Sequence, residues 1–548
     1  MKSEFPEMRE GREYSLIKGS GFKGFFRKSI SIFSIMLAIV GISVLNLLYF
    51  SHNLDFSRLF NSDSLFLPSL YREFSLGSFS FKTFFFSGAI FIFPDWIIYL
   101  VSRLLGGSTY YAIPLYFTIQ ISLLFALNYF ILEAFLHRKE KALLFSSFVC
   151  VFLVALDASI HVDDWPFGIS LLSVSHFGEF LSWVASSYVV ICLLADHLSL
   201  KHLSVKRSSF HLILILLVAL TTISDRLFIA NWTIPALLSL YVLRRGRLLG
   251  HWTFLALSSE IIVASMAGYW WLPNALGIHS GFYENGVHIG NVYHNIKILH
   301  QIFLVFFRIH LNTSIFLLIL YVGSLIGLRN SFKKQTYLSA DKLIDTGLRR
   351  FLFVFLLLVF FFTCLAMVSS ADFILSNYGE VRYMIPVFLS PIVLAPVLLR
   401  EYRVPFGEQV SEVFFLSAAV VILVWVVSKK VSPNVAFSRS YYPESVMCVD
   451  REASASGIHR GIALYWLARY ITILSKKVTV VQVNPDTSPY LWESDSRWYR
   501  GTFDFAIVSK GDDRTMRLFK RQLGVPKSII DCSKLVILNY GLGNVSLK

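Results

Sequence analysis

Long apolar runs, separated by short polar stretches, fill most of the chain up to residue 430. Many of these runs approach about 20 residues, the length that an α-helix needs to cross the hydrocarbon core of a bilayer. The first run, Ser29–Phe50, follows a polar segment, residues 1–29, that is rich in Lys and Arg. Because such positive charge stays on the cytoplasmic side, we expect the N-terminus to lie in the cytoplasm.

The alternation of apolar runs and basic loops predicts about eleven membrane crossings within residues 30–430. An odd number of crossings places the chain beyond residue 430 on the outer side of the membrane. The first outer loop then comprises residues 51–109. The predicted crossings are residues 29–50, 110–135, 142–156, 177–195, 210–224, 227–243, 252–272, 301–328, 351–369, 382–399 and 413–427.

The first outer loop contains two short amphipathic segments, Leu65–Phe74 and Trp96–Leu105. The second segment is too short to span a bilayer, so we expect it to lie flat on the outer surface as an interfacial helix. The alternative is three crossings between residues 51 and 136 in place of one, which would squeeze two spans into about 30 residues.

The composition changes near residue 436, which predicts a small extracytoplasmic α/β domain at residues 431–548. The predicted strands are 445–449, 478–483, 503–508 and 535–538, and the predicted helices are 457–477 and 513–523. Cys448 and Cys532 lie in this domain and can form a disulfide if it is outside the cytosol. The fold class is thus an α-helical polytopic membrane protein with outer-face interfacial helices and a small C-terminal α/β domain.

The net charge of +15 does not indicate a nucleic-acid partner. The Lys and Arg residues collect in short loops between apolar runs, as the positive-inside bias requires. Such a surface can also attract anionic lipids of the bilayer.

Isolated acids, histidines and one arginine gather on the outer side of this topology, where an ionised group close to lipid is costly. A solvated loop explains most of them, and Asp225 and Arg226 are expected to pair locally. The outer-side residues are Asp63, Asp95, Asp157, His161, Asp163, Asp164, His176, Asp225, His288, His294, Glu380 and Arg382. The charges inside the predicted crossings are Glu133, Glu179, Glu260 and Arg308.

Four segments resemble the GT-C superfamily of membrane glycosyltransferases, which includes protein O-mannosyltransferases and aminoarabinose transferases. Asp63-Ser-Leu-Phe-Leu-Pro-Ser-Leu-Tyr-Arg-Glu is similar to the first outer loop of that group, although Ser64 stands where a second acid is usual. Phe93-Pro-Asp-Trp-Ile-Ile-Tyr99 resembles its interfacial helix, and His161-Val-Asp-Asp-Trp165 occupies the place of its second outer loop. Val381-Arg-Tyr-Met-Ile-Pro386 resembles the start of a late helix. The resemblance covers mostly the architecture of the membrane domain.

The resemblance implies an enzyme that transfers a hexose or pentose, with inversion, from a polyprenyl-phosphate donor. The acceptor would be a glycan, lipid or protein of the cell envelope, on the outer face of the inner membrane. One alternative is a non-enzymatic transporter of lipid or polysaccharide, which would place ionisable residues at mid-membrane and use broken helices. Another is an envelope assembly factor whose working part is the C-terminal domain.

Sugar transfer needs a general base, and Asp63 is the candidate because a carboxylate can take the proton of an acceptor hydroxyl or amine. The alternative role of Asp63 is the N-cap of helix Leu65–Phe74. Arg382 is the candidate for holding the donor phosphate with fixed positive charge. Its alternatives are an interfacial anchor or an ion pair with Glu380.

Five further residues are candidates for binding the acceptor or substrate: Asp95, His161, Asp163, Asp164 and His288. The His161-Val-Asp-Asp segment can contribute ligands to Mg²⁺ or Mn²⁺, but no complete set is visible, so we predict no metal site and no cofactor. The aromatic residues of 461–470, 488–492 and 497–499 fit contact with carbohydrate or packing against the membrane domain.

Overall fold

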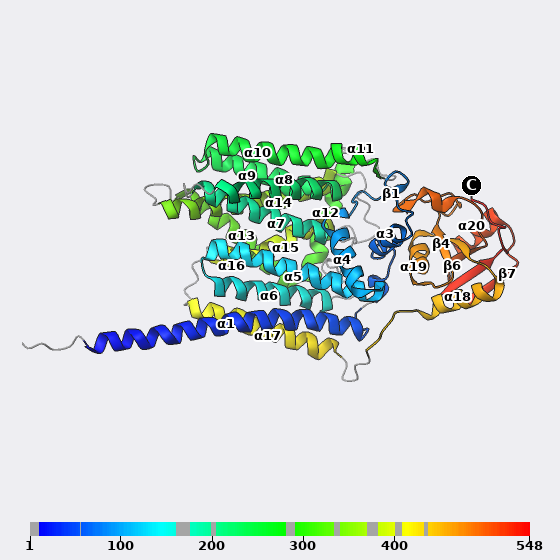
Figure 1. Cartoon of the computed structure of the whole chain (residues 1–548), viewed down its shortest axis with the longest axis horizontal. Helices are drawn as coiled ribbons and strands as arrows, with labels where there is room; N and C mark the ends of the chain where they lie inside the picture. Colours follow the sequence, from blue (N-terminus) through cyan, green and yellow to red (C-terminus); the bar gives the residue numbers. More distant parts are fainter. Residues whose placement is uncertain are drawn as a thin grey trace, which may run out of the picture.

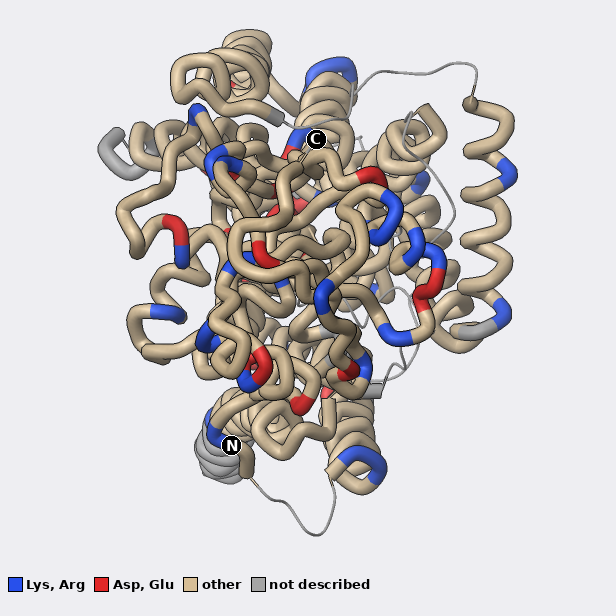
Figure 2. Tube along the Cα trace, turned by 90° about the vertical axis from the view of Figure 1, so that its right-hand side faces the viewer, with Lys and Arg blue, Asp and Glu red and all other residues tan. Residues whose placement is uncertain are grey.

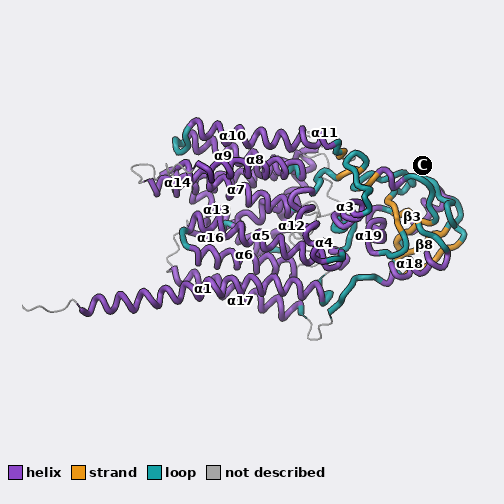
Figure 3. Tube along the Cα trace, viewed as in Figure 1, coloured by secondary structure: helices purple, strands orange, loops and turns teal. Residues whose placement is uncertain are grey.

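The computed structural model describes residues 10–54, 56–159, 176–198, 204–280, 291–333, 340–369, 382–400, 408–431 and 437–547 of the chain. The described chain forms a bundle of long helices running side by side, with a smaller domain covering one end (Figure 1). The strands gather at that end, whereas the bundle is helical (Figure 3). Figure 2 looks onto the covered end, where basic and acidic positions are interspersed.

Among the described residues, seven helices are long and apolar enough to cross a membrane. The chain is therefore a polytopic helical membrane protein, as the length of its apolar runs predicts. Six of these segments lie within one helix each: Lys28–Phe50 of α1 (Glu10–Phe50), α5 (Thr109–Leu136), Phe177–His197 of α7 (Phe177–Leu198), Leu311–Phe332 of α13 (Leu311–Lys333), Ile344–Ser369 of α14 (Ala340–Ser369) and Glu412–Lys430 of α17 (Glu408–Lys430). The seventh, His251–Leu276, comprises α10 (His251–Met266), η4 (Ala267–Trp271) and α11 (Leu272–Leu276).

The other predicted crossings are helical too, but their helices do not meet that length and composition. They are α6 (Lys139–Ser159), α8 (Ser204–Ser224), η3 with α9 (Ile229–Thr233 and Ile234–Arg245), and α15 with α16 (Ile385–Val393 and Ala395–Leu399). Seven candidate spans therefore stand where the sequence predicts about eleven crossings.

Two predicted crossings are broken helices. The prediction for 301–328 is wrong, because the chain leaves helical geometry at His310, between α12 (Val292–Ile309) and α13. The prediction for 382–399 is wrong in the same way: α15 ends before Leu394 and α16 starts at Ala395. Pro391 and Pro396 lack the backbone N–H that a continuous helix would use, which accounts for the second break.

The outer loop predicted between the crossings 252–272 and 301–328 is wrong in its last part, which is helical, since α12 begins at Val292 and contains His294. The segment folds as a helix because Ile298, Ile302 and Phe306 follow at four-residue spacing and are all buried. This period places them on one face of a helix.

Both short amphipathic segments of the first outer loop form helices, as predicted. They are α3 (Phe66–Ser75) and α4 (Ile97–Gly106), and η1 (Ile92–Trp96) leads into α4. They lie between the bundle and the C-terminal domain (Figure 1). On α4, Ser102 and Tyr99 are buried, whereas Leu104 and Leu105 are exposed. An exposed apolar face on a short helix is what an interfacial position requires.

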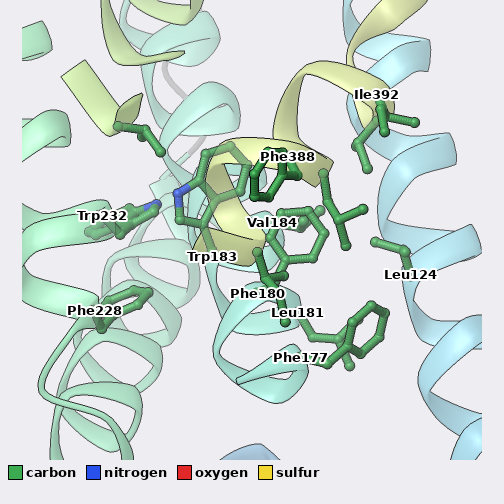
Figure 4. Close-up of a cluster of buried hydrophobic side chains, with 14 of the residues drawn as sticks. Leu124, Phe177, Phe180, Leu181, Trp183, Val184, Phe228, Trp232, Phe388 and Ile392 are labelled. Atoms are coloured by element: carbon green, nitrogen blue, oxygen red, sulfur yellow. The ribbon is translucent and has the colours of Figure 1, made fainter. Parts of the chain in front are cut away.

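The core of the bundle is aromatic. Phe180 and Trp183 of α7 stack on each other and point toward Phe388 of α15, while Phe228 stacks on Trp232 (Figure 4). All five side chains are buried. Close-packed rings of this size give the bundle a large apolar interior, so the helices around them are held in fixed positions.

The C-terminal domain is an α/β domain, as predicted, built on a sheet in the order β4-β3-β6-β8-β7. The strands β4, β3 and β6 are parallel, and β8 runs antiparallel to both of its neighbours. The elements are α18 (Glu444–Ser456), β3 (Arg460–Ala463), α19 (Tyr465–Leu474), β4 (Thr479–Gln482), β5 (Ser494–Asp495), β6 (Phe505–Ser509), α20 (Asp513–Leu523), β7 (Ser528–Cys532) and β8 (Leu535–Asn539).

Two local predictions for this domain are wrong. Residues 445–449 belong to helix α18, and the predicted helix 457–477 begins with the buried strand β3. Both segments are short apolar runs, for which periodicity does not separate a strand from a helix. Strand β7 was not predicted.

A second, small sheet joins the C-terminal domain to the first outer loop. Its order is β2-β1-β5, where β1 (Phe84–Phe86) pairs with β5 and with β2 (His279–Ser280). Phe84 and Phe86 of β1 are fully buried. The backbone of the C-terminal domain is thus hydrogen-bonded to the outer loop.

Cys448 and Cys532 form a disulfide, as their shared domain allowed, and Cys150, Cys192 and Cys364 are free. A disulfide persists in an oxidising compartment.

Removing the disulfide is expected to destabilise the C-terminal domain. The two cysteines are 84 residues apart, and a cross-link over such a loop contributes about 4 kcal/mol through the entropy of the unfolded chain. Cys448→Ala should therefore lower the apparent unfolding temperature of the purified, non-reduced protein. Cys364→Ala, which removes a free thiol, is the control. Equal unfolding temperatures for Cys448→Ala and the parent protein would contradict the assignment.

Candidate functional site

Asp63 lies at the junction of three parts of the chain. Its Oδ2 is 3.2 Å from Nη1 of Arg382, and its Oδ1 accepts a hydrogen bond of 2.6 Å from the hydroxyl of Tyr465. Arg382 is 319 residues away in sequence and Tyr465 is 402 residues away. The two residues with the main predicted roles, Asp63 and Arg382, are therefore direct neighbours.

Asp63 does not cap α3. The N-cap position is Leu65, and no side chain caps that helix end. The nearby backbone N–H of Ser64 donates to the side-chain oxygen of Asn61. The carboxylate of Asp63 thus bonds to Arg382 and Tyr465 across the junction and not to the N-terminus of α3. The alternative partner of Arg382, Glu380, lies outside the described residues.

The guanidinium of Arg382 keeps an unused donor. Its Nε is buried and has no hydrogen-bond partner within the described part of the chain. Its Cζ lies 5.5 Å from the ring centroid of Tyr383. A buried N–H without an acceptor is costly, so an anion that accepts it would be bound favourably.

A buried ion pair outside the predicted site residues fixes the backbone of Ser62, the residue before Asp63. Nη1 of Arg469 donates to Oε2 of Glu493 at 2.8 Å, and it also donates to the carbonyl oxygen of Ser62 at 2.6 Å. Both charged side chains are buried. Burial raises the pKa of Glu493, and Arg469 acts against that shift. Tyr465 also lies 3.2 Å from Glu493, so one hydroxyl bridges two carboxylates.

A signal for this pair is present in the sequence. Tyr465 and Arg469 are four residues apart on α19, which places them on one face. The aromatic run 461–470 was singled out for contact with carbohydrate or for packing against the membrane domain, and the structure shows packing. The partners Ser62 and Glu493 lie on other elements, and no local pattern points to them.

Asp95, a predicted substrate-binding residue, belongs to a second buried cluster and does not contact Asp63. Its Oδ1 accepts hydrogen bonds from the hydroxyl of Tyr116 at 2.5 Å and from Nε2 of Gln120 at 3.3 Å. Burial raises the pKa of Asp95 to about 7, although the bond from Tyr116 lowers it. Asp95 also lies against Gly178, at the start of α7.

His176, Glu179 and Asp225 lie next to Asp95 and are all buried. Nδ1 of His176 contacts Oδ2 of Asp225, and Oε1 of Glu179 accepts a hydrogen bond of 3.0 Å from Asn231. The predicted local pair of Asp225 and Arg226 is wrong. Asp225 faces His176 instead, and the guanidinium of Arg226 lies 5.2 Å from a tyrosine ring.

The two clusters are joined by one aromatic ring. The ring of Tyr383 lies 4.7 Å from that of His176, and Arg382 is next to Tyr383 in the chain. The polar groups thus form a continuous path from the C-terminal domain, through Asp63, to the start of α7. The predicted residues His161, Asp163, Asp164 and His288 lie outside the described residues.

A basic cavity of about 330 Å³ lies between α3, α4 and the C-terminal domain. Its cationic side chains are Arg72, Arg103, Lys476 and Lys477, and none of its lining residues is acidic. Arg72 is held by a hydrogen bond of 3.0 Å to Oγ1 of Thr479. The chemistry of this cavity suits an anion at the level of the interfacial helices.

Comparisons with known proteins add no family assignment. No protein-family model matches this chain, and no curated protein matches it either.

Arg469→Ala is expected to destabilise the protein strongly, because it leaves Glu493 buried without its partner. Breaking a buried ion pair costs about 3–5 kcal/mol. The apparent unfolding temperature of the purified protein is the measurement. Lys510→Ala is the control, since Lys510 pairs with Asp531 on the surface and such pairs contribute about 0–1 kcal/mol. Equal effects of the two substitutions would contradict the role given to Arg469.

Gly178→Ala is expected to disturb the second cluster. A Cβ at Gly178 would lie 2.0 Å from Oδ2 of Asp95, so the carboxylate would have to move from its partners. Overpacking of this kind costs about 1–3 kcal/mol, which a lower apparent unfolding temperature would report. Gly250→Ala is the control, because the nearest atom there is 3.8 Å away. An unchanged temperature for Gly178→Ala would show that the cluster tolerates the displacement.

Proposed function

We propose that this protein is a membrane glycosyltransferase of GT-C type. It transfers a sugar from a polyprenyl-phosphate donor to an acceptor of the cell envelope, on the outer face of the inner membrane. The proposal rests on the resemblance of the first outer loop and of the Arg382 segment to that superfamily. The observation that carries it is the direct contact of Asp63 and Arg382.

A carboxylate beside a guanidinium provides the two charges that this reaction needs. Asp63 accepts the proton of the acceptor hydroxyl or amine, and the acceptor atom then attacks the anomeric carbon of the sugar. The bond from that carbon to the phosphate oxygen breaks, and the lipid phosphate leaves with the electron pair. Arg382 stabilises the charge that develops on the phosphate. Attack opposite the leaving group inverts the anomeric centre.

The ion pair of Asp63 and Arg382 is the resting arrangement in this proposal. A donor phosphate competes with Asp63 for Arg382 and can accept its unused Nε–H. Displacement from Arg382 frees Oδ2 of Asp63 for the acceptor, while the hydroxyl of Tyr465 keeps the carboxylate in place. The donor's own charge thus activates the base only when a substrate is present.

The surroundings of Asp63 suit a lipid-borne donor. The amphipathic helix α4, which belongs to the same outer loop as Asp63, exposes apolar side chains, including Val101 and Leu104. The basic cavity next to α3 offers several cations to a phosphate that approaches from the membrane surface. The disulfide of the C-terminal domain supports an outer location of the site.

A transporter of lipid or polysaccharide is the second candidate. The broken helices at His310 and Leu394 favour it, because discontinuous helices often form the binding sites of transporters. A transporter moves its lipid across the bilayer without breaking the bond between sugar and phosphate. The chemical fate of the donor therefore distinguishes the two candidates.

Asp63→Asn is expected to abolish sugar transfer while the protein stays folded. The assay uses the full-length protein in vesicles, polyprenyl-phosphate donors with a radiolabelled hexose or pentose, and an envelope fraction as acceptor. Loss of a general base should lower the rate of label transfer by about 10²–10⁴-fold. Asp513→Asn is the matched control, because Asp513 is an exposed carboxylate of the C-terminal domain.

Full transfer by Asp63→Asn would refute the assignment of the base. Movement of intact labelled donor across the bilayer, without release of its sugar by the parent protein, would instead favour the transporter. The apparent unfolding temperature of each variant shows whether a loss of activity reflects a loss of structure.

A further inference from the structure

Three buried carboxylates and one histidine lie together at the start of α7. The residues Asp95, His176, Glu179 and Asp225 are each less than 5% exposed. Carboxylates that are removed from water must be neutralised by a partner charge, by protons or by a metal ion. The negative charge of these three carboxylates therefore needs a neutralising group.

No lysine or arginine in the described part of the chain forms an ion pair with these three carboxylates. The nearest arginine in sequence, Arg226, lies over the ring of Tyr269 instead. Asp95 is satisfied by the neutral donors Tyr116 and Gln120. Of the three carboxylates, the one that forms an ion pair with His176 among the described residues is Asp225, so the histidine alone does not balance the cluster.

The geometry of three of these residues fits a metal ion. One ligand atom each of His176, Glu179 and Asp225 lie within 4.8 Å of one another. Metal–ligand bonds of nitrogen and oxygen are about 2.0–2.2 Å long, so small side-chain rotations bring all three atoms to one ion. The three residues come from the two helix ends at α7 and α8, which the aromatic core holds in place.

A carboxylate oxygen without a hydrogen-bond partner also supports a metal ion at this site. Oε2 of Glu179 is buried and has no hydrogen-bond partner among the described residues, whereas Oε1 is held by Asn231. The amide of Asn231 is fixed in turn, because the hydroxyl of Thr363 donates to its Oδ1 at 2.8 Å. Such outer contacts orient a metal ligand and leave one oxygen free for the ion.

We propose that His176, Glu179 and Asp225 bind a divalent transition-metal ion, of the Mn²⁺ or Zn²⁺ class. One imidazole with two carboxylates is a donor set for such ions. The ion supplies the positive charge that the cluster otherwise lacks. It also lies one aromatic ring, Tyr383, away from Arg382. Metal binding is independent of the proposed sugar transfer, because it rests on these buried ligands alone.

The test is the metal content of the purified full-length protein, measured by mass spectrometry after dialysis against metal-free buffer. About one Mn²⁺ or Zn²⁺ ion per chain is expected to remain bound. Glu179→Gln and His176→Ala should each reduce that content by at least about tenfold, because each removes one ligand. His211→Ala is the matched control, since His211 and Glu260 form a partly exposed pair with Nδ1 and Oε2 2.8 Å apart.

A second measurement covers the case in which a variant folds poorly. The parent protein is treated with EDTA, and its apparent unfolding temperature is recorded with and without added MnCl₂ or ZnCl₂. A rise on adding one of these metals is expected for the parent protein and for His211→Ala, but not for Glu179→Gln.

A parent protein that retains no stoichiometric metal and gains no stability from either ion would overturn the proposal. The carboxylates would then be neutralised by protons. Equal metal content in Glu179→Gln and the parent protein would overturn the ligand assignment. Bound metal without any sugar transfer would leave this site intact and count against the proposed glycosyltransferase alone.

Discussion

The buried ion pair of Arg469 and Glu493 is the contact on which the arrangement of this protein depends. It lies where the C-terminal domain meets the first outer loop, and Arg469 also binds the carbonyl oxygen of Ser62. Both charged residues belong to the C-terminal domain, and it is the bonds from Arg469 to Ser62 and from Tyr465 to Asp63 that attach this domain to the first outer loop. The pairing of β1 with β5 adds backbone hydrogen bonds to the same junction.

This junction determines the environment of Asp63. The C-terminal domain supplies Tyr465, whose hydroxyl bridges Asp63 and Glu493. The membrane domain supplies Arg382 from the opposite side. Two carboxylates and two guanidinium groups therefore meet at this junction. The Arg469–Glu493 pair is buried and the Arg382–Asp63 pair is partly exposed, and each charge is close to an opposite one. Such balance lowers the cost of placing the half-buried carboxylate of Asp63 beside the membrane.

The sequence predicted much of the local structure and some of the site. The apolar runs predicted the helices of the bundle, and the amphipathic segments predicted α3 and α4 nearly to the residue. Asp63 and Arg382 were chosen separately, on their chemistry and on their resemblance to a family. The cluster at the start of α7 was not foreseen. Asp225 was expected to pair with its neighbour, and Glu179 was noted only as a charge inside a crossing.

What the sequence determined by itself is the set of helices and their apolar faces, because run length and periodicity are local properties of the chain. The breaks at His310 and Leu394 and the strand β3 needed the packed structure, since short apolar segments fit more than one backbone conformation. The partners of the charged residues were decided by tertiary structure alone. Asp63 and Arg382 are 319 residues apart, and only the packing of the bundle against the C-terminal domain brings them together.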